Sequence, residues 1–315
     1  MKKKFSGAVC VSRYDNHLIT NAYGFSDYSN GLLNDMYTRF NMAQGSSIFT
    51  AVLVMILREK GMLDLDDPIG KYLRIPLRNI DRDITIRQLL NQTSGVPKMV
   101  EDDNYRMFWE TKDTSKIRYN ADLVPFFLTK EMRFEKGTKC ELNDTNFILL
   151  ALIIETLTKK PLDQMIERWI IKPCRMNETG FYSLNQLPGN TANGMMEEND
   201  ELISNIYHCE IKGNGASGAY TTCYDLCRFW KCLFSEDLIS QESLDEMLKD
   251  QGHGYGLGLH LVQHKGKSIV VIAGERPGAS MISSFAPHNG IQISVFSNNE
   301  SDVKKIHDEL SVDLW

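Results

Sequence analysis

The sequence predicts an α+β sandwich in which one antiparallel sheet is assembled from both ends of the chain, with flanking helices and an inserted, mainly helical lobe. Strand-like segments occur near the start, helical and loop patterns fill the middle, and strand-like segments return toward the end. The 315 residues are 42% apolar and 24% charged, which is typical of a globular protein. We expect a single domain over residues 1–315, with a sheet lobe at about 1–46 and 206–315 and a helical lobe at about 47–205.

The first elements are a hairpin and a helix. Two short strands, Gly7–Ser12 and His17–Gly24, flank the polar turn Arg13–Asn16, which predicts an antiparallel pair. Ser47–Lys60 then carries apolar residues at helical spacing, and Gly61 stands where a helix would end. This pattern predicts a buried amphipathic helix.

The remaining chain predicts further helices and the second half of the sheet. Asn146–Thr158 is apolar around most of its circumference, which is typical of a central helix. Tyr224–Phe234 is helical in pattern, with Thr222 as its N-cap. Four strand-like segments and a last helix follow: Tyr255–Leu261, Ser268–Ala273, Ala279–Phe285, Ile291–Phe296 and Ser301–Leu310. We expect the functional site in the groove between the two lobes.

Charge and hydropathy exclude several classes of partner. The chain has 35 basic and 41 acidic residues, so it lacks the broad basic footprint of a protein that binds nucleic acid or anionic membranes. The segment after Lys2–Lys4 is too short and too mixed for a signal peptide. The longest apolar run, Ala51–Leu57, is far below the roughly 20 residues of a membrane span. We therefore expect a cytoplasmic protein with no nucleic-acid or membrane partner.

The cysteines and histidines do not predict a metal site. Seven cysteines, an odd number without CxxC spacing, are expected to be free thiols. Cys223 and Cys227 face the same side of a predicted helix and are a possible metal pair, but no third ligand lies near them in sequence. His253, His260 and His264 lie near strand ends, where turn and surface histidines are common. We expect neither a metal ion nor a cofactor.

Several segments carry a family resemblance. Phe40–Leu73, which reads FNMAQGSSIFTAVLVMILREKGMLDLDDPIGKYL, resembles the start of the class C β-lactamase, penicillin-binding protein and esterase family. There an aromatic residue leads into an SxxK helix and a GxLxLDDP segment. Further segments are similar to the family in its own order: Ile84–Gly95, Gly137–Leu150, Ile171–Phe181, Gly215–Phe229 and Arg276–Ser280. The resemblance covers nearly the whole chain and implies a β-lactamase/DD-peptidase-like fold.

The chemistry of that family depends on a few side chains. A Ser at a helix start attacks a carbonyl while a Lys three residues later takes its proton. A Tyr-x-Asn loop supplies a second proton relay, and a Lys-Thr-Gly or His-x-Gly segment lines the other wall. Two backbone N–H groups form the oxyanion hole. The resemblance places these donors at Gln44 and Glu275.

The side chains at these positions differ from the family pattern. In chain order the catalytic positions are occupied by Gln44, Ser47, Leu142, Asp144, Ile272 and Gly274. Gln44 replaces the nucleophile and Ser47 the base, while Gly274 is retained. We therefore expect that the chain has no catalytic residues and is not acylated by substrates, which would make it a pseudoenzyme. Its cleft would serve to bind a small molecule or a protein.

A hydrolase with relocated machinery is the alternative. Ser46 and Ser47 are followed three residues later by Phe49 and Thr50, so a shifted register does not create SxxK. Loss of a nucleophile or base costs on the order of 10⁶ in rate in a well-studied serine hydrolase. The alternative therefore needs Ser46 or Ser47 to meet a base from elsewhere in the chain.

Six residues are candidate cleft or ligand-binding groups: Gln44, Ser46, Ser47, Asp144, Glu275 and Arg276. Two interpretations of the charged members remain open. Asp144, Glu275 and Arg276 form a new polar constellation that clamps a ligand or acts as general acid and base. Alternatively, Arg276 pairs with one of the acids at the surface.

Overall fold

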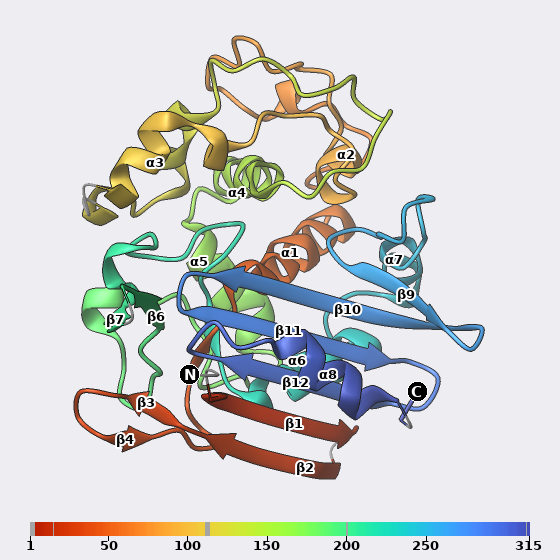
Figure 1. Cartoon of the computed structure of the whole chain (residues 1–315). Helices are drawn as coiled ribbons and strands as arrows, with labels where there is room; N and C mark the ends of the chain where they lie inside the picture. The colour runs from red at the N-terminus through yellow and green to blue at the C-terminus, as the bar shows by residue number, and fades with distance from the viewer. Residues whose placement is uncertain (1–3, 15, 111–113, 200, 313) are drawn as a thin grey trace.

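A computed structural model describes residues 4–14, 16–110, 114–199, 201–312 and 314–315 (Figure 1). Its main sheet has six antiparallel strands in the order β2-β1-β12-β11-β10-β9. The strands are β1 Gly7–Arg13, β2 Asn16–Tyr23, β9 His260–His264, β10 Lys267–Arg276, β11 Ala279–Ala286 and β12 Ile291–Ser297. The prediction of one antiparallel sheet built from both termini is confirmed.

Helices and three small strand pairs complete the described part of the chain. The helices are α1 Ser47–Glu59, α2 Ile86–Leu90, α3 Asp103–Glu110, α4 Asp144–Thr158, α5 Leu162–Ile166, α6 Cys223–Phe234, α7 Gln241–Met247 and α8 Val303–Ser311. The small pairs are β3 Phe25–Asp27 with β4 Leu32–Leu33, β5 Phe40–Asn41 with β8 Tyr220–Thr221, and β6 Met195–Glu198 with β7 Glu201–Ser204. None of the helices among the described residues has the length and apolar character to span a bilayer.

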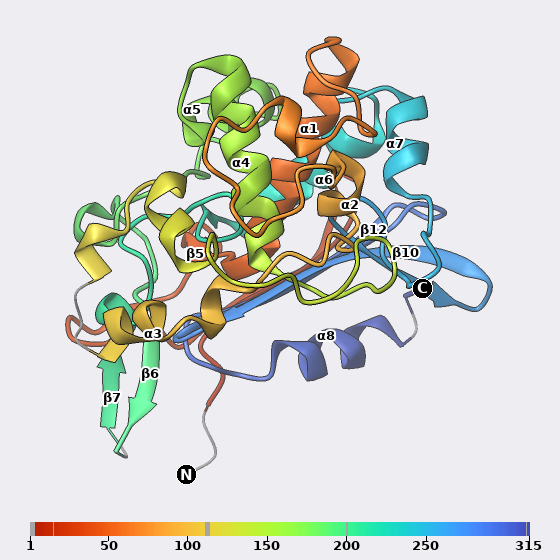
Figure 2. The same cartoon turned by 90° about the horizontal axis from the view of Figure 1, so that it is seen from above.

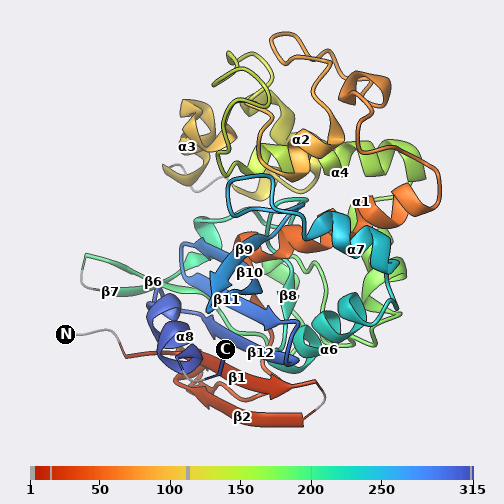
Figure 3. The same ribbon diagram turned by 90° about the vertical axis from the view of Figure 1, so that its right-hand side faces the viewer.

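Helices cover both faces of the main sheet (Figure 2). On one face α8 packs through Val303 against an apolar layer that includes Val9 and Val295. On the other face α1 and α6 lie over the main core, to which β10 contributes Ile272. Figure 3 shows α2, α3 and α4 grouped beyond β9, at the opposite end of the molecule from β1 and β2. The sheet therefore separates two apolar layers.

Side-chain caps fix the starts of helices α4 and α6. The Asn143 side chain accepts a hydrogen bond from the Thr145 N–H at 3.0 Å, so α4 starts two residues before the apolar pattern predicts. Thr222 accepts from the Asp225 N–H at 3.1 Å, which confirms it as the N-cap of α6.

One predicted strand is largely wrong. The segment Tyr255–Leu261 alternates like a strand, but β9 begins only at His260. Gly254 and Gly258, with φ of +67° and +87°, put turns into the segment that precedes it. Because β9 is short, it pairs with β10 only as far as Val271 opposite His260. The end of β10 beyond that point therefore borders a groove.

Candidate ligand-binding cleft

A strained turn presents Gln44 to β10. The 3-10 turn Ala43–Ser46 leads into α1, and Ala43 has φ of +45°, a region that disfavours a residue with a side chain. Two hydrogen bonds hold it there: the Ala43 N–H donates to Asn41 Oδ1 at 2.8 Å, and the Gly218 N–H donates to the Ala43 carbonyl at 3.2 Å. The surrounding structure thus enforces the position of the next residue.

Gly274 allows the turn and β10 to approach each other closely. A Cβ at residue 274 would lie 2.4 Å from the backbone N of Gln44 and 2.6 Å from that of Gly45. No side chain fits at that distance. The glycine that the resemblance assigns to the Lys-Thr-Gly or His-x-Gly segment is therefore required sterically at position 274.

The Gln44 amide connects three of the family positions. Its Oε1 accepts a hydrogen bond from the Glu275 backbone N–H at 3.0 Å, and its Nε2 donates to Asp144 Oδ2 at 3.4 Å. The Glu275 N–H is one of the two donors that the resemblance assigns to the oxyanion hole. That donor therefore already has an acceptor from the same protein.

Asp144 is the first residue of α4 and lies against Gln44. Burial raises the pKa of its carboxyl above the ordinary value, while the Gln44 hydrogen bond and the positive charges of Arg276 and Lys98 act in the opposite direction. The resemblance aligns Asp144 with an Asn of the family, and the cleft holds a titratable group at this position.

The cleft consists of two hollows that share lining residues. A small cavity of about 100 Å³ is lined by residues that include Gln44, Ser47, Leu142, Asp144 and Ile272. Beside it a groove of about 700 Å³ runs along the end of β10 to the start of α8 and shares Gln44, Leu142 and Asp144. The structure thus brings residues from all three family motifs to one place.

The two serines of the alternative hypothesis differ in access. Ser46 is 1% exposed, and its Oγ donates to the Ala43 carbonyl at 3.0 Å and accepts from the Ala219 N–H at 3.4 Å. Ser47 is half-buried and lines the small cavity. Within the described residues, no His, Lys or carboxylate group makes a hydrogen bond to either hydroxyl.

Arg276 lies in a buried network that the sequence did not predict. Its guanidinium pairs with Glu210, whose side chain is 1% exposed, and donates to Ser217 Oγ at 3.1 Å. The Tyr105 hydroxyl donates to the other Glu210 oxygen at 2.8 Å. The interpretation of Arg276 as one half of a surface pair is therefore wrong. Glu210 is 66 positions from Arg276, so no local sequence pattern predicts that the two residues pair.

The constellation of Asp144, Glu275 and Arg276 is not a set of side chains in mutual contact. Arg276 is held by Glu210, and its charge acts on Asp144 only at a distance. The Glu275 side chain is exposed, and its contribution to the cleft is the backbone N–H bound by Gln44.

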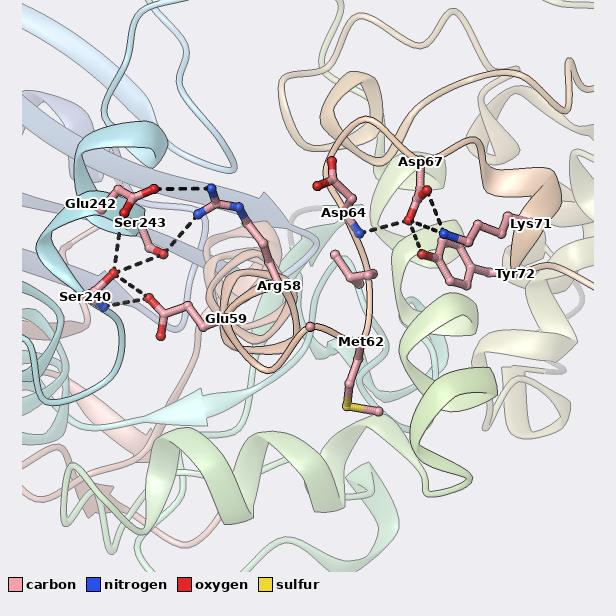
Figure 4. Close-up of a pocket in the computed structure, with 12 residues that line it drawn as sticks. Arg58, Glu59, Met62, Asp64, Asp67, Lys71, Tyr72, Ser240, Glu242 and Ser243 are labelled. Atoms are coloured by element: carbon pink, nitrogen blue, oxygen red, sulfur yellow. Dashed lines mark hydrogen bonds and ion pairs between the residues drawn. The ribbon is translucent and has the colours of Figure 1, made fainter.

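A second large hollow lies apart from the cleft, between the end of α1 and the start of α7 (Figure 4). Its volume is about 620 Å³, and several of its charged groups have hydrogen-bond or ion-pair partners within it. Arg58 pairs with Glu242, Glu59 accepts from Ser240, and Asp67 pairs with Lys71. Because these groups already satisfy each other, this hollow is a weaker candidate than the cleft.

Comparison with known proteins places the chain in a family. The sequence profile of the family described as Beta-lactamase matches residues 1–312. A penicillin-binding protein of Bacillus subtilis (strain 168) is 28% identical over 329 aligned positions, which cover 96% of this chain and 70% of the relative. The crystal structure of a penicillin-binding protein from Bacillus halodurans superimposes with a TM-score of 0.92 at 26% identity, covering 98% of this chain and 95% of that one.

More distant structures share the fold. A D-stereospecific amidohydrolase from Streptomyces sp. has a TM-score of 0.83 at 23% identity, over 98% of this chain and 94% of that chain. The match of the family profile to almost every residue, in a sheet with this strand order, leaves one conclusion. The chain belongs to the beta-lactamase family of penicillin-binding-protein-like serine hydrolases.

Proposed function

We propose that this chain is a non-acylating member of its family that binds a ligand without covalent chemistry in the cleft beside β10. The observation that carries the proposal is the side chain of Gln44. It stands at the nucleophile position, and its amide bridges the Glu275 N–H and the Asp144 carboxyl.

An amide at that position opposes acyl transfer in two ways. Its nitrogen lone pair is delocalised into the carbonyl, so it has no group to form an acyl-enzyme with a substrate. Its Oε1 also takes the Glu275 N–H that would otherwise stabilise a tetrahedral oxyanion. With Ser47 at the base position, neither the attacking group nor its proton acceptor is in place.

The groove supports binding. It keeps about 700 Å³ of space, within the range of small-molecule sites. Its lining includes the carboxylates Asp144, Glu275, Glu300 and Asp302 and one cation, Lys304. This balance favours a ligand, either a small molecule or a segment of a protein, that presents neutral or cationic groups. Penicillins are carboxylate anions and fit this lining poorly.

Intact-protein mass spectrometry tests the proposal. The chain is incubated with a fluorophosphonate and, separately, with a penicillin, beside an active class C β-lactamase. We expect an unmodified mass for this chain and an adduct on the control. A stoichiometric adduct mapped to Ser46, Ser47 or another serine would refute the proposal.

The alternative of relocated serine chemistry has little support in the geometry. The Ser46 hydroxyl is buried and bound to backbone groups. Ser47 faces the small cavity, but among the described residues no base contacts its hydroxyl. A serine without a base keeps its proton near neutral pH and is a weak nucleophile.

A further inference from the structure

Three potential metal ligands meet at the edge of the sheet opposite the cleft. Cys10 of β1, His17 of β2 and Cys227 of α6 each offer one ligand atom, and all three atoms lie within 4.8 Å of one another. The Cys10 and Cys227 sulfurs are 3.7 Å apart, and Cys10 Sγ lies 4.0 Å from His17 Nδ1. Residues up to 217 positions apart in sequence thus converge on one point.

Cys223 lies outside the group of three whose ligand atoms are all within 4.8 Å of one another, but it is a candidate fourth ligand beside that group. The Cys223 thiol acts on that of Cys10, whose pKa it raises. Cys223 stands one helical turn before Cys227, so both side chains leave α6 on the same face.

A bulge in the hairpin aims His17 at the cysteines. The β1–β2 register pairs Val11 with Ile19 but Ser12 with His17, which leaves Leu18 as the extra residue. Directly paired residues point to the same face of a sheet, and Ser12 points to Cys227, with 3.3 Å between its Oγ and the sulfur. Without the extra residue, His17 would point to the other face.

The surroundings suit a bound cation. Gln292 Oε1 accepts hydrogen bonds from the Cys227 thiol at 2.8 Å and from Ser12 Oγ at 2.9 Å, so a carbonyl oxygen also borders the cluster. The His17 ring packs edge-on against Tyr224, with centroids 4.7 Å apart, which restricts its orientation. Cys10 and Cys227 are buried, whereas His17 is exposed and leaves a path from solvent.

We propose that Cys10, His17, Cys223 and Cys227 form a structural zinc site. Sulfur and imidazole ligands are those that zinc prefers, and Zn–S bonds of about 2.3 Å at tetrahedral angles place two sulfurs roughly 3.8 Å apart. The separation of 3.7 Å between Cys10 and Cys227 matches this value. On binding, the thiols release their protons to solvent, and the imidazole binds in its neutral form.

The zinc site would stabilise the fold and would not form part of the cleft. Strands β12 and β11 lie between β1 and β10, so the two sites are three strand spacings apart, roughly 14 Å. Zinc would tie the β1–β2 hairpin to the start of α6. The proposal is therefore independent of the function of the cleft.

The test measures zinc in the reduced, tag-free chain after dialysis against zinc and then buffer. We expect about one zinc per chain, and, after replacement by cobalt, the visible bands of tetrahedral cobalt with thiolate charge transfer. His17→Ala and Cys227→Ser should each lose the metal to a chelator that leaves the wild-type chain loaded. Cys140→Ser removes a thiol outside the cluster and should keep its zinc.

The variants also separate loss of ligand from loss of fold. His17 is exposed, so His17→Ala should keep the circular dichroism spectrum of the wild-type chain while losing zinc. Cys223→Ser should shift the cobalt bands because one thiolate is lost. Three results would overturn the proposal: no zinc on the reduced chain, full zinc retention by both His17→Ala and Cys227→Ser, or a Cys10–Cys227 disulfide whose reduced form binds no metal.

Discussion

Gln44 lies in a turn whose local geometry is held in place by its surroundings. The positive φ of Ala43 and the close approach of Gly274 to Gln44 are still in place. Strain of this kind persists only where the surrounding structure enforces it. The turn has thus kept its geometry although the side chain it presents is an amide.

At Asp144 we predict a stability gain from a neutral side chain. Burial raises the pKa of this carboxyl, so folding favours the protonated form, and stability falls as pH rises through the ordinary value of about 4. Asp144→Asn is neutral at every pH and keeps an oxygen for Gln44 Nε2. It should raise the Tm at pH 7, with the gain shrinking toward pH 4. A Tm difference that stays the same at both values would contradict this interpretation.

At Glu210 we predict a large loss of stability. Removing one partner of a buried ion pair leaves the other charge uncompensated, so Glu210→Ala should cost about 3–5 kcal/mol in the free energy of unfolding. The double variant Glu210→Ala with Arg276→Met should recover part of that loss. Glu275 precedes Arg276 and is exposed, so Glu275→Ala should change the free energy of unfolding by less than about 0.5 kcal/mol. Urea unfolding measures all three, and equal losses for Glu210→Ala and Glu275→Ala would contradict the buried pairing.

Among the elements, α8 carries a pH-dependent contact with the sheet. His307 is 1% exposed, and its Nε2 lies 2.8 Å from Ser284 Oγ of β11. Burial lowers the pKa of the imidazole, with the neighbouring Asp308 acting in the opposite direction. The folded chain therefore holds a neutral ring that protonates more readily once the chain unfolds.

This arrangement predicts a stability loss in mild acid. Because the folded pKa lies below the ordinary value of about 6.5, the contribution is complete above that pH and is lost as the pH falls through it. Denaturant melts from pH 7.5 to 5.5 should show a decline with a slope of up to about 1.4 kcal/mol per pH unit from this group. The free energy of unfolding of His307→Gln should decline less steeply with falling pH. Parallel curves for the variant and the wild-type chain would contradict the role given to His307.

Elements with a strong local signal were predictable from the sequence. Apolar residues at helical spacing predicted α1, and Thr222 and Gly61 marked helix ends correctly. The ten consecutive residues from Ile48 to Leu57 are all buried, so α1 is buried on every side rather than amphipathic. The segment Tyr255–Leu261 failed because alternation alone does not show the positive φ of Gly254 and Gly258. Local chemistry thus predicted the elements better than it predicted where β9 begins.

On the scale of the whole molecule, contacts between distant segments were the part that sequence could not supply. The Arg276–Glu210 pair joins the end of β10 to a loop 66 residues earlier. The approach of Cys10 and His17 to Cys227 depends on the packing of α6 against β1 and on a one-residue bulge. The residues at the family positions in the cleft could be predicted from the sequence, because the motifs that resemble the family identify them.

In our proposal, the side chains at the catalytic positions of the family, above all Gln44 and Ser47, prevent acylation. The most direct test is the intact mass, after exposure to a fluorophosphonate, of the wild-type chain and of a variant with Gln44→Ser, Ser47→Lys and Leu142→Tyr. We predict an unmodified wild-type chain and an adduct on the variant that maps to position 44. An adduct on the wild-type chain, or a folded variant labelled at another serine instead of position 44, would contradict the proposal.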